Sequence, residues 1–146
     1  MRTSSVALIA VLFWPMAWAT GADRYAANSG SGSAGTNWST AYTNVQDALN
    51  AAGNGDTIYV AGQTFPLSTQ LVWSSAAVNV TVRGGYAATN NSPLPGTRDT
   101  TRWPTILQMA TSNQPVLSIQ GVTNGGLEGV AITGERQDVL RSTTKN

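Results

Sequence analysis

The sequence predicts an all-β protein, a parallel β-solenoid of about three to four rungs seen from its helix-capped N-terminal end. A single short helix pattern ends just before the segment Asn54-Gly55-Asp56-Thr57-Ile58-Tyr59-Val60, and short strand patterns follow it. Their clearest inward positions are Ile58, Val80, Ile106 and Ile132. Each interval between them falls within the ~20–50 residues of a solenoid repeat. Two packed sheets of a sandwich would show similar short strands, and that alternative stays open.

The segment 1–19 has the pattern of a secretory signal peptide. Arg2 supplies a short positive region, an apolar run follows over 6–14, and Ala17-Trp18-Ala19 fits the small-x-small cleavage pattern. We expect cleavage after Ala19. The apolar run is shorter than the ~20 residues of a membrane span. The protein is therefore expected to be secreted or held at the cell surface, with no transmembrane span after cleavage.

Composition excludes several classes of site. The chain has 146 residues, of which 41% are hydrophobic and 10% charged, and removal of Arg2 leaves seven basic and seven acidic residues. This balance lacks the basic footprint of a nucleic-acid-binding protein. The chain has neither cysteine nor histidine, which removes disulfides and the usual zinc and copper ligands. We expect no metal site and no cofactor.

Four segments follow one another along the chain. The predicted signal peptide (1–19) precedes an edge strand and a Gly/Ser-rich loop (20–37). The predicted capping helix and strand repeats occupy 38–134, and a polar tail without a strand pattern closes the sequence (135–146). Within the repeats, residues 87–104 are predicted to form a long surface loop, of a length that is often functional in compact domains.

The strongest local pattern is an amphipathic helix. Its apolar stripe occupies positions i, i+3, i+4 and i+7, namely Val45, Ala48, Leu49 and Ala52. Thr43 is the predicted N-cap, with Gln46 reaching back to complete a capping box. Asp47 lies in the first turn, where the helix dipole favours a carboxylate. Gly53 is predicted to end the helix in the left-handed conformation.

Strand patterns begin after the Asn54-Gly55 turn, where the hydrophobic period changes to two. Inward and outward residues alternate over 57–60 and 78–83. Glycines, among them Gly84-Gly85, are predicted to mark the strand ends. Weaker strand patterns occur at 105–109, 116–119 and 130–133.

The order of these motifs resembles secreted right-handed parallel β-helix proteins of the pectin-lyase-like superfamily, in particular polymorphic outer-membrane-protein-like bacterial surface proteins. The resemblance covers roughly Tyr25 to Gly134. It is carried by Trp38-Ser39-Thr40-Ala41-Tyr42, Val45-Gln46-Asp47-Ala48-Leu49, Gly55-Asp56-Thr57-Ile58-Tyr59-Val60-Ala61, Arg83-Gly84-Gly85-Tyr86, Arg98-Asp99, Pro104-Thr105-Ile106-Leu107 and Leu127-Glu128-Gly129-Val130-Ala131-Ile132-Thr133-Gly134.

The resemblance implies the fold more than an activity, because similar domains serve as adhesins, passenger domains and polysaccharide-active enzymes. Such proteins continue through many more rungs than this chain contains. We therefore expect a fragment of a longer surface or secreted protein, with an open C-terminal end that invites self-association.

Candidate site residues are few. The predicted outward strand positions carry no carboxylate; they are Thr57, Tyr59, Asn79, Thr81, Ala131 and Thr133. Asp56 precedes a strand, where Asx chemistry stabilises a turn, and Asp99 is expected to form an exposed ion pair with Arg98 or Arg102. We predict no catalytic residue.

Aromatic residues give the remaining candidates for a binding site. Trp38 and Tyr42 are expected to pack beside the helix, whereas Trp73 and Trp103 border loops and are candidate carbohydrate contacts. The predicted function is an exported scaffold or adhesin-like segment without catalysis, which binds carbohydrate or other surface ligands. The alternative is the N-terminal part of a polysaccharide lyase or glycoside hydrolase whose catalytic rungs are absent here.

Overall fold

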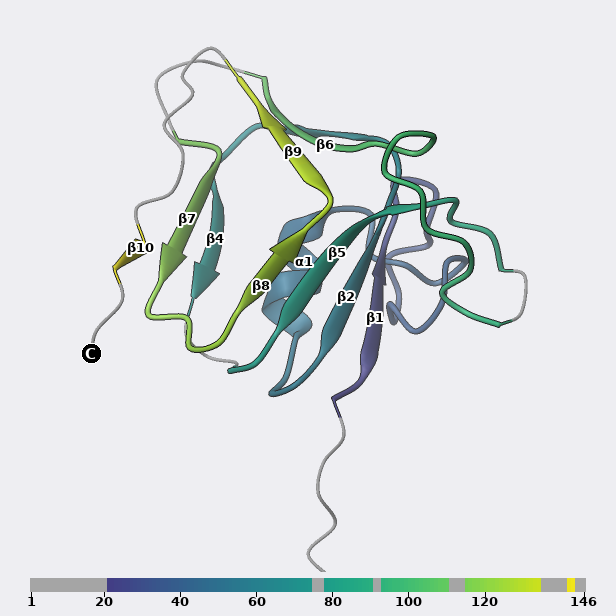
Figure 1. The fold of residues 1–146 in the computed structure, drawn as a ribbon, viewed down its shortest axis with the longest axis horizontal. Helices are drawn as coiled ribbons and strands as arrows, with labels where there is room; N and C mark the ends of the chain where they lie inside the picture. The colour runs from purple at the N-terminus through teal and green to yellow at the C-terminus, as the bar shows by residue number, and fades with distance from the viewer. Residues whose placement is uncertain (1–20, 75–77, 91–92, 111–114, 135–141, 144–146) are drawn as a thin grey trace, which may run out of the picture.

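The computed structural model describes residues 21–74, 78–90, 93–110, 115–134 and 142–143. The described part is mostly strand with one short helix (Figure 1), which confirms the all-β class. The elements are β1 (Asp23–Ala26), α1 (Val45–Ala51), β2 (Thr57–Ala61), β3 (Thr64–Leu67), β4 (Leu71–Ser74), β5 (Thr81–Tyr86), β6 (Thr105–Met109), β7 (Leu117–Gln120), β8 (Gly126–Glu128), β9 (Val130–Thr133) and β10 (Ser142–Thr143). The predicted signal peptide and most of the predicted polar tail lie outside the described residues.

The strands form three separate parallel sheets. Sheet A has the order β1-β2-β5-β8, sheet B the order β3-β6-β9, and sheet C the order β4-β7-β10. Every pairing within them is parallel. From β2 onward the chain enters sheets A, B and C in the same order three times. We call each such pass a circuit.

Register partners in neighbouring circuits are separated by similar numbers of residues, except where a long loop lies between them. Thr57 pairs with Thr81, 24 positions later, and Thr105 pairs with Val130, 25 positions later. Thr81 pairs with Gly126, 45 positions later, because the loop 87–104 lies between β5 and β6. The loop lengthens the circuit without changing its strand pairing.

The predicted series of inward positions joined residues of different sheets. Ile58 lies in sheet A and pairs with Val82, whereas Ile106 lies in sheet B and pairs with Ala131. The intervals in that series resembled the true circuit because each circuit contributes one short apolar strand to every sheet. Periodicity alone does not say which of the three sheets a strand enters.

The sequence analysis missed β3, β4 and β8, and it expected a strand from 78 where β5 begins only at Thr81. It placed two later strands correctly. β6 and β9 have the predicted bounds 105–109 and 130–133. β3 and β4 carry the same period-two signal, with burial alternating along each strand. Phe65 and Leu67 point into the core from β3, and Leu71 and Trp73 do so from β4. In the sequence this alternation is hidden, because β4 has three consecutive apolar residues, Leu71-Val72-Trp73, and β3 contains Pro66.

The ends of α1 differ from the predicted ones. Asn44, not Thr43, is the N-cap, and its side chain accepts a hydrogen bond from the Asp47 backbone N–H at 2.8 Å. The helix ends at Ala51, and Ala52 follows in an extended conformation, so Gly53 does not act as a left-handed cap. Gln46 does not close a capping box, because its side chain bonds to β4.

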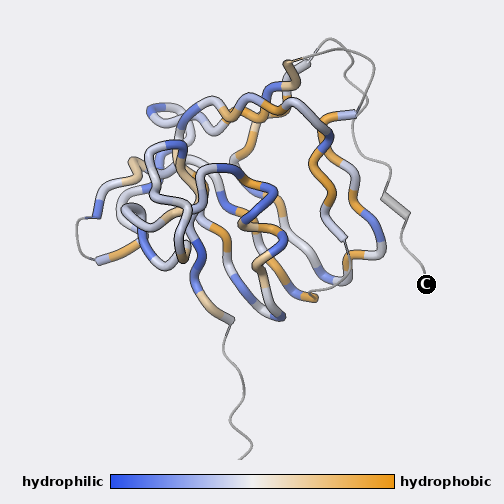
Figure 2. Tube along the Cα trace, turned by 180° about the vertical axis from the view of Figure 1, so that it is seen from behind, coloured by the Kyte–Doolittle hydropathy of each residue, from blue (hydrophilic) through white to orange (hydrophobic). Residues whose placement is uncertain are grey.

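The core lies between the three sheets, where apolar side chains stack in register from circuit to circuit. Hydrophobic and hydrophilic residues alternate along the strands (Figure 2). Ile58, Val82 and Leu127 form one inward column in sheet A, and Phe65, Leu107 and Ile132 form another in sheet B. Val45 and Ala48 of α1 are buried with them. No helix in the described part of the chain is long and apolar enough to cross a membrane.

Candidate functional site

Aromatic and charged side chains are concentrated on the outer face of sheet A. One register column on this face runs through four adjacent strands, Tyr25, Tyr59, Arg83 and Glu128. Trp38 packs on the aromatic end of the column. This face is the candidate functional site, because sheets B and C expose mainly small and uncharged residues in the described ranges.

A β-bulge brings a third tyrosine onto this face. Tyr59 pairs with Arg83, but Ala61 pairs with Tyr86, so β5 contains one extra residue at this point. Gly84 and Gly85 accommodate it, with Gly85 at φ +95°. If side chains alternated regularly along β5, Tyr86 would point to the same side as Val82, into the core. The bulge reverses the alternation, so Tyr86 points outward. The glycine pair was predicted to end a strand, and instead it redirects a side chain within one.

Thr105 holds the bulge from beneath. Its hydroxyl oxygen accepts a hydrogen bond from the Gly85 N–H at 2.9 Å, and the hydroxyl donates to the Ala61 carbonyl at 2.8 Å. Thr105 is 1% exposed, so no water replaces these bonds. Gly84 lies so close to this residue that a Cβ would come within 2.8 Å of the Thr105 Cβ and 2.4 Å of the Gly129 carbonyl oxygen.

The aromatic rings contact one another across the face. Tyr25 meets Trp38 edge to face at a centroid distance of 4.9 Å, and Tyr59 meets Tyr86 edge to face at 5.2 Å. Tyr25 and Tyr59 are 5.4 Å apart. Pairs of this kind contribute ~0.5–1.5 kcal/mol each beyond burial. We call these four residues, Tyr25, Trp38, Tyr59 and Tyr86, the aromatic cluster.

Two loops cover the aromatic cluster. The Trp38 indole donates a hydrogen bond to the Pro95 carbonyl at 2.9 Å, and the Ser39 N–H donates to the Asn90 side chain at 3.3 Å. These bonds connect the segment after β1 to the loop 87–104. Trp38 is 3% exposed, but its ring packs against Tyr25 and Tyr86 on the outer face of sheet A, whereas the sequence predicted packing beside the helix. The aromatic cluster is therefore largely buried and extends the hydrophobic core to the outer side of sheet A.

Burial keeps the phenols of the cluster protonated. It raises the pKa of Tyr25 to about 12, with further contributions from Asp23 and the neighbouring tyrosines. Burial also raises the pKa values of Tyr59 and Tyr86. A tyrosine with a raised pKa does not act as a base near neutral pH. These residues can donate hydrogen bonds and stack, but they do not supply a proton acceptor.

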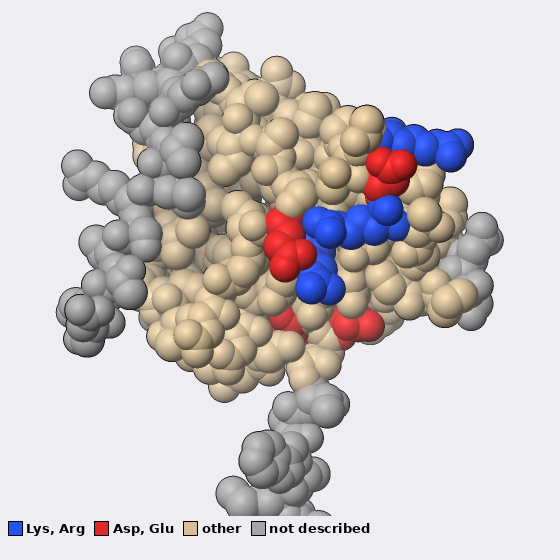
Figure 3. Space-filling model, in the orientation of Figure 1, with Lys and Arg blue, Asp and Glu red and all other residues tan. Residues whose placement is uncertain are grey.

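The charged end of the face is a small network of Arg83, Arg98 and Glu128. Arg83 Nε lies 3.2 Å from Glu128 Oε2 without the geometry of a hydrogen bond, and an Arg98 terminal nitrogen lies 3.9 Å from the same oxygen. Figure 3 shows opposite charges in contact near the middle of this face, with two acidic side chains below them and a further pair of opposite charges towards the upper right. Exposed pairs of this kind contribute ~1 kcal/mol or less. Arg98 also donates from Nε to the Gly84 carbonyl at 2.9 Å, which ties the loop 87–104 to the bulge.

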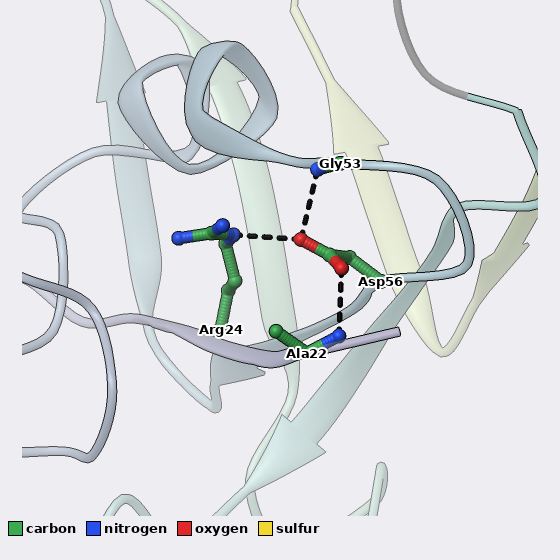
Figure 4. Close-up of polar contacts among 4 residues, drawn as sticks. All are labelled: Ala22, Arg24, Gly53 and Asp56. Carbon is green, nitrogen blue, oxygen red and sulfur yellow. Dashed lines mark hydrogen bonds and ion pairs between the residues drawn. The ribbon is translucent and has the colours of Figure 1, made fainter. Parts of the chain in front are cut away.

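Asp56 joins the first two strands of sheet A (Figure 4). One carboxylate oxygen accepts from the Ala22 N–H at 2.7 Å, and the other accepts from the Gly53 N–H and from Arg24 Nε, both at 2.8 Å. Burial raises the pKa of this carboxyl, but the backbone hydrogen bonds and the guanidinium outweigh burial, so the pKa lies below its ordinary value. Asp56 therefore has a structural role, as its sequence position suggested.

The other described carboxylates are also engaged or isolated. Asp47 bonds to the Asn44 side chain, and Asp99 accepts from the Thr101 and Arg102 backbone rather than forming the expected ion pair. Asp23 is exposed on β1. A glycosidase needs two free carboxyl groups ~5–10 Å apart. Two described carboxylates, Asp23 and Glu128, act on the pKa values of the tyrosines of the cluster, and Glu128 is paired with Arg83. Within the described ranges, no group of three or more Asp, Glu, His or Cys side chains is arranged to hold a metal.

The chain matches no known family model, no curated protein and no solved structure. The chemistry of the site is therefore inferred from the residues themselves. In the described residues the phenols are protonated, Asp56 and Glu128 are paired with arginines, and Arg98 also bonds to a backbone carbonyl.

The two candidate carbohydrate contacts lie in different environments and are not brought together. Trp73 points into the core from β4 and is 4% exposed, so its ring offers no face to a sugar. The expectation that its ring stays open to solvent assumed that Trp73 lies outside a strand, whereas it lies within β4. Trp103 is half-buried just before β6, and the Arg102 guanidinium lies 5.0 Å from its ring centroid. Of the two, only Trp103 presents part of its ring to solvent.

Proposed function

We propose that the protein is an exported, non-catalytic scaffold, the helix-capped N-terminal segment of a right-handed parallel β-helix. The observation that carries this proposal is the repeated passage through sheets A, B and C with parallel, in-register pairing. A sandwich would pair its strands in antiparallel hairpins and Greek keys instead. In this view the three sheets are the faces of one β-helix and α1 covers its first end.

The scaffold assignment is supported by how the polar groups are used. Asp56, Thr105 and Arg98 bond to backbone groups of neighbouring strands and turns. Such bonds fix the positions of strands and loops, and they leave these side chains unavailable to a substrate. An adhesin-like role needs a stable face with recognition in its loops, and the loops 28–42 and 87–104 lie together over the aromatic cluster.

Export is supported by the residues that follow the predicted cleavage site. Gly21 lies against the turn before β2, since a Cβ there would overlap the Gly55 carbonyl, and the Ala22 N–H donates to Asp56. Cleavage after Ala19 would therefore leave only Thr20 ahead of the first residues with fixed partners. Secretion from a bacterial host with the native leader should yield protein that begins at Thr20, and retention of Met1 would contradict export.

The β-helix is tested by disulfide trapping, which is clean because the chain has no cysteine. Ser74 and Gln120 are exposed register partners in sheet C. The double variant Ser74→Cys/Gln120→Cys should oxidise to an intramolecular disulfide, because paired strands lie ~4.8 Å apart. The control Ser74→Cys/Gln108→Cys places its thiols on different sheets and should stay reduced. Equal oxidation of both would contradict the circuits.

The rival function, a polysaccharide-active enzyme, would release products from a polysaccharide, whereas a scaffold would not. The scaffold proposal expects no turnover of acidic or neutral polysaccharides, and any carbohydrate binding is expected to depend on Trp103. A panel of polysaccharides assayed for reducing ends and for unsaturated products would decide between the two. Turnover that is lost on substitution of a described residue would overturn the scaffold assignment.

A further inference from the structure

The first described residues are docked against the turn that precedes β2. The Ala22 N–H donates to Asp56 Oδ1 at 2.7 Å, and the Ala22 carbonyl accepts from the Thr57 N–H at 3.0 Å. Gly21 lies so close to the Gly55 carbonyl that there is no room for a Cβ. The fold therefore holds the backbone from the first described residue onward.

β1, which follows directly, is held on both of its edges. On one edge it pairs in parallel with β2 along its whole length. On the other edge the Tyr25 N–H donates to the Gly35 carbonyl at 2.9 Å, and the Tyr25 carbonyl accepts from the Tyr42 N–H at 2.8 Å. Tyr25 is 1% exposed and belongs to the aromatic cluster. β1 therefore cannot leave the fold without uncovering part of the core.

Asp56 fastens the same segment through its side chain (Figure 4). Besides the Ala22 N–H, its carboxylate binds Arg24 Nε and the Gly53 N–H, both at 2.8 Å. Asp56 is 4% exposed. If the segment undocked, this carboxylate would lose the donors from Ala22 and Arg24, and a buried charge without its partners is strongly unfavourable. The docked form of the segment is therefore stabilised by both backbone and side-chain bonds.

The docked segment lies directly beside the predicted cleavage site. The bond after Ala19 is outside the described residues, but only Thr20 separates it from Gly21. Extended peptides are commonly recognised through their main-chain N–H and C=O groups, and a peptidase must grip the chain on both sides of the bond that it cuts. The enzyme and the fold therefore compete for the same stretch of backbone.

We propose that removal of the leader precedes the docking of β1, so that a chain that folds first keeps its leader. This proposal rests on the export proposed above. Cleavage of a docked chain requires that the segment first open, and its rate then follows the population of the open form. Opening breaks the pairing of β1 and the bonds of Asp56, so this population is small. The chain is processed while sheet A is incomplete, and docking completes the fold.

The order is tested by cell-free synthesis of the full-length chain with bacterial signal peptidase in detergent. The peptidase is either present from the start or added after the chain has folded. Mass spectrometry measures the appearance of a chain that begins at Thr20. We expect the folded chain to lose its leader at least ~10-fold more slowly than the chain under synthesis, because cleavage samples only the open form.

Two variants separate docking from a poor cleavage site. A flexible Gly-Ser-Gly-Ser spacer between Thr20 and Gly21 moves the bond away from the docked segment and should restore rapid cleavage of the folded chain. Asp56→Ala, far from the bond in sequence, should also accelerate it. Asp99→Ala is the matched control, because this carboxylate binds only the loop 87–104 among the described contacts. It should leave the rate unchanged. If Asp56→Ala fails to fold, the spacer variant decides.

Each other outcome counts against the proposal in a distinct way. Equal rates with early and late peptidase would overturn the order of the two steps. A folded chain that resists cleavage equally with and without the spacer would overturn the role of docking. Failure of cleavage even during synthesis would show that the segment 1–19 is not a cleaved leader, and the export proposal would then fall together with this one.

Discussion

Gln46 and Val72 bond to each other as two strands would, although one lies in a helix and the other in a strand. The amide oxygen of Gln46 accepts from the Val72 N–H and its amide nitrogen donates to the Val72 carbonyl. A second bond from the same nitrogen to Asn50 at 2.9 Å fixes the side chain along α1. The helix thereby positions a peptide-like group at the edge of sheet C.

Removing this amide should weaken the first end of the fold. Gln46→Ala is expected to lower the free energy of unfolding by ~0.5–1.5 kcal/mol, the net value of a partly exposed hydrogen bond or two. Urea unfolding followed by circular dichroism measures the change. Gln108→Ala, on the exposed face of β6, is the control and should have little effect. Similar losses from both variants would contradict the role assigned to Gln46.

Asp56 should make stability depend on pH. Its pKa is lower in the folded protein than the ordinary value, so its contribution is fully present above the unfolded pKa of about 3.9 and is lost as the pH falls through the folded pKa. Asp56→Asn should destabilise the protein by ~1–3 kcal/mol at neutral pH, and the difference from wild type should shrink in acid. Unfolding at several pH values measures it, with the exposed Asp23→Asn as control.

Thr105 should be needed for the bulge. Thr105→Val keeps the shape but leaves the buried Gly85 N–H without its partner, at a cost of ~1–3 kcal/mol, while the Ala61 carbonyl keeps its hydrogen bond from the Gln63 N–H. Thr105→Ser retains the hydroxyl and should recover most of the loss. Because the bulge directs Tyr86 outward, the valine variant should also alter the near-ultraviolet circular dichroism of the aromatic cluster. Identical stability of the two variants would contradict this account.

The Trp38 indole should hold the loop 87–104 in place. Trp38→Phe keeps a ring but removes the hydrogen bond to the Pro95 carbonyl. We expect faster cleavage in this loop by a protease at native conditions, with the remaining strands still protected. Trp103→Phe is the control, because no side-chain hydrogen bond of Trp103 is among those described. Unchanged cleavage of the Trp38 variant would show that the rings alone fix the loop.

Sequence patterns predicted correctly those elements whose formation depends on residues close to one another in the chain. The helix at 45–51 and the strands β6 and β9 follow from spacing of apolar residues within a few positions. The N-cap was misplaced by one residue because Thr43 and Asn44 are both good caps. Asn44 caps the helix, and the Gln46 side chain bonds to the distant strand β4 instead of reaching back to Thr43.

The candidate site was harder to predict because it depends on which strands are neighbours. Tyr25, Tyr59 and Tyr86 come together only when β1, β2 and β5 are placed side by side and the bulge is known. Arg24 and Asp56 are likewise 32 positions apart. The burial of Trp73 was foreseeable from its alternation with Leu71, but only once β4 had been recognised as a strand.

The corner between sheets A and B has a further consequence. In successive circuits it consists of Gly62 and Gln63, then of the long loop 87–104, and then of Gly129 alone. The sheet B strands that follow the corner keep their register throughout, whereas β5 enters it through the bulge. The number of residues in this corner can therefore vary without changing which residues pair in sheet B. Foreign peptides inserted after Gly62 or at Gly129 should be displayed at the surface without repacking the core, which makes this corner a graft site for epitopes or affinity tags.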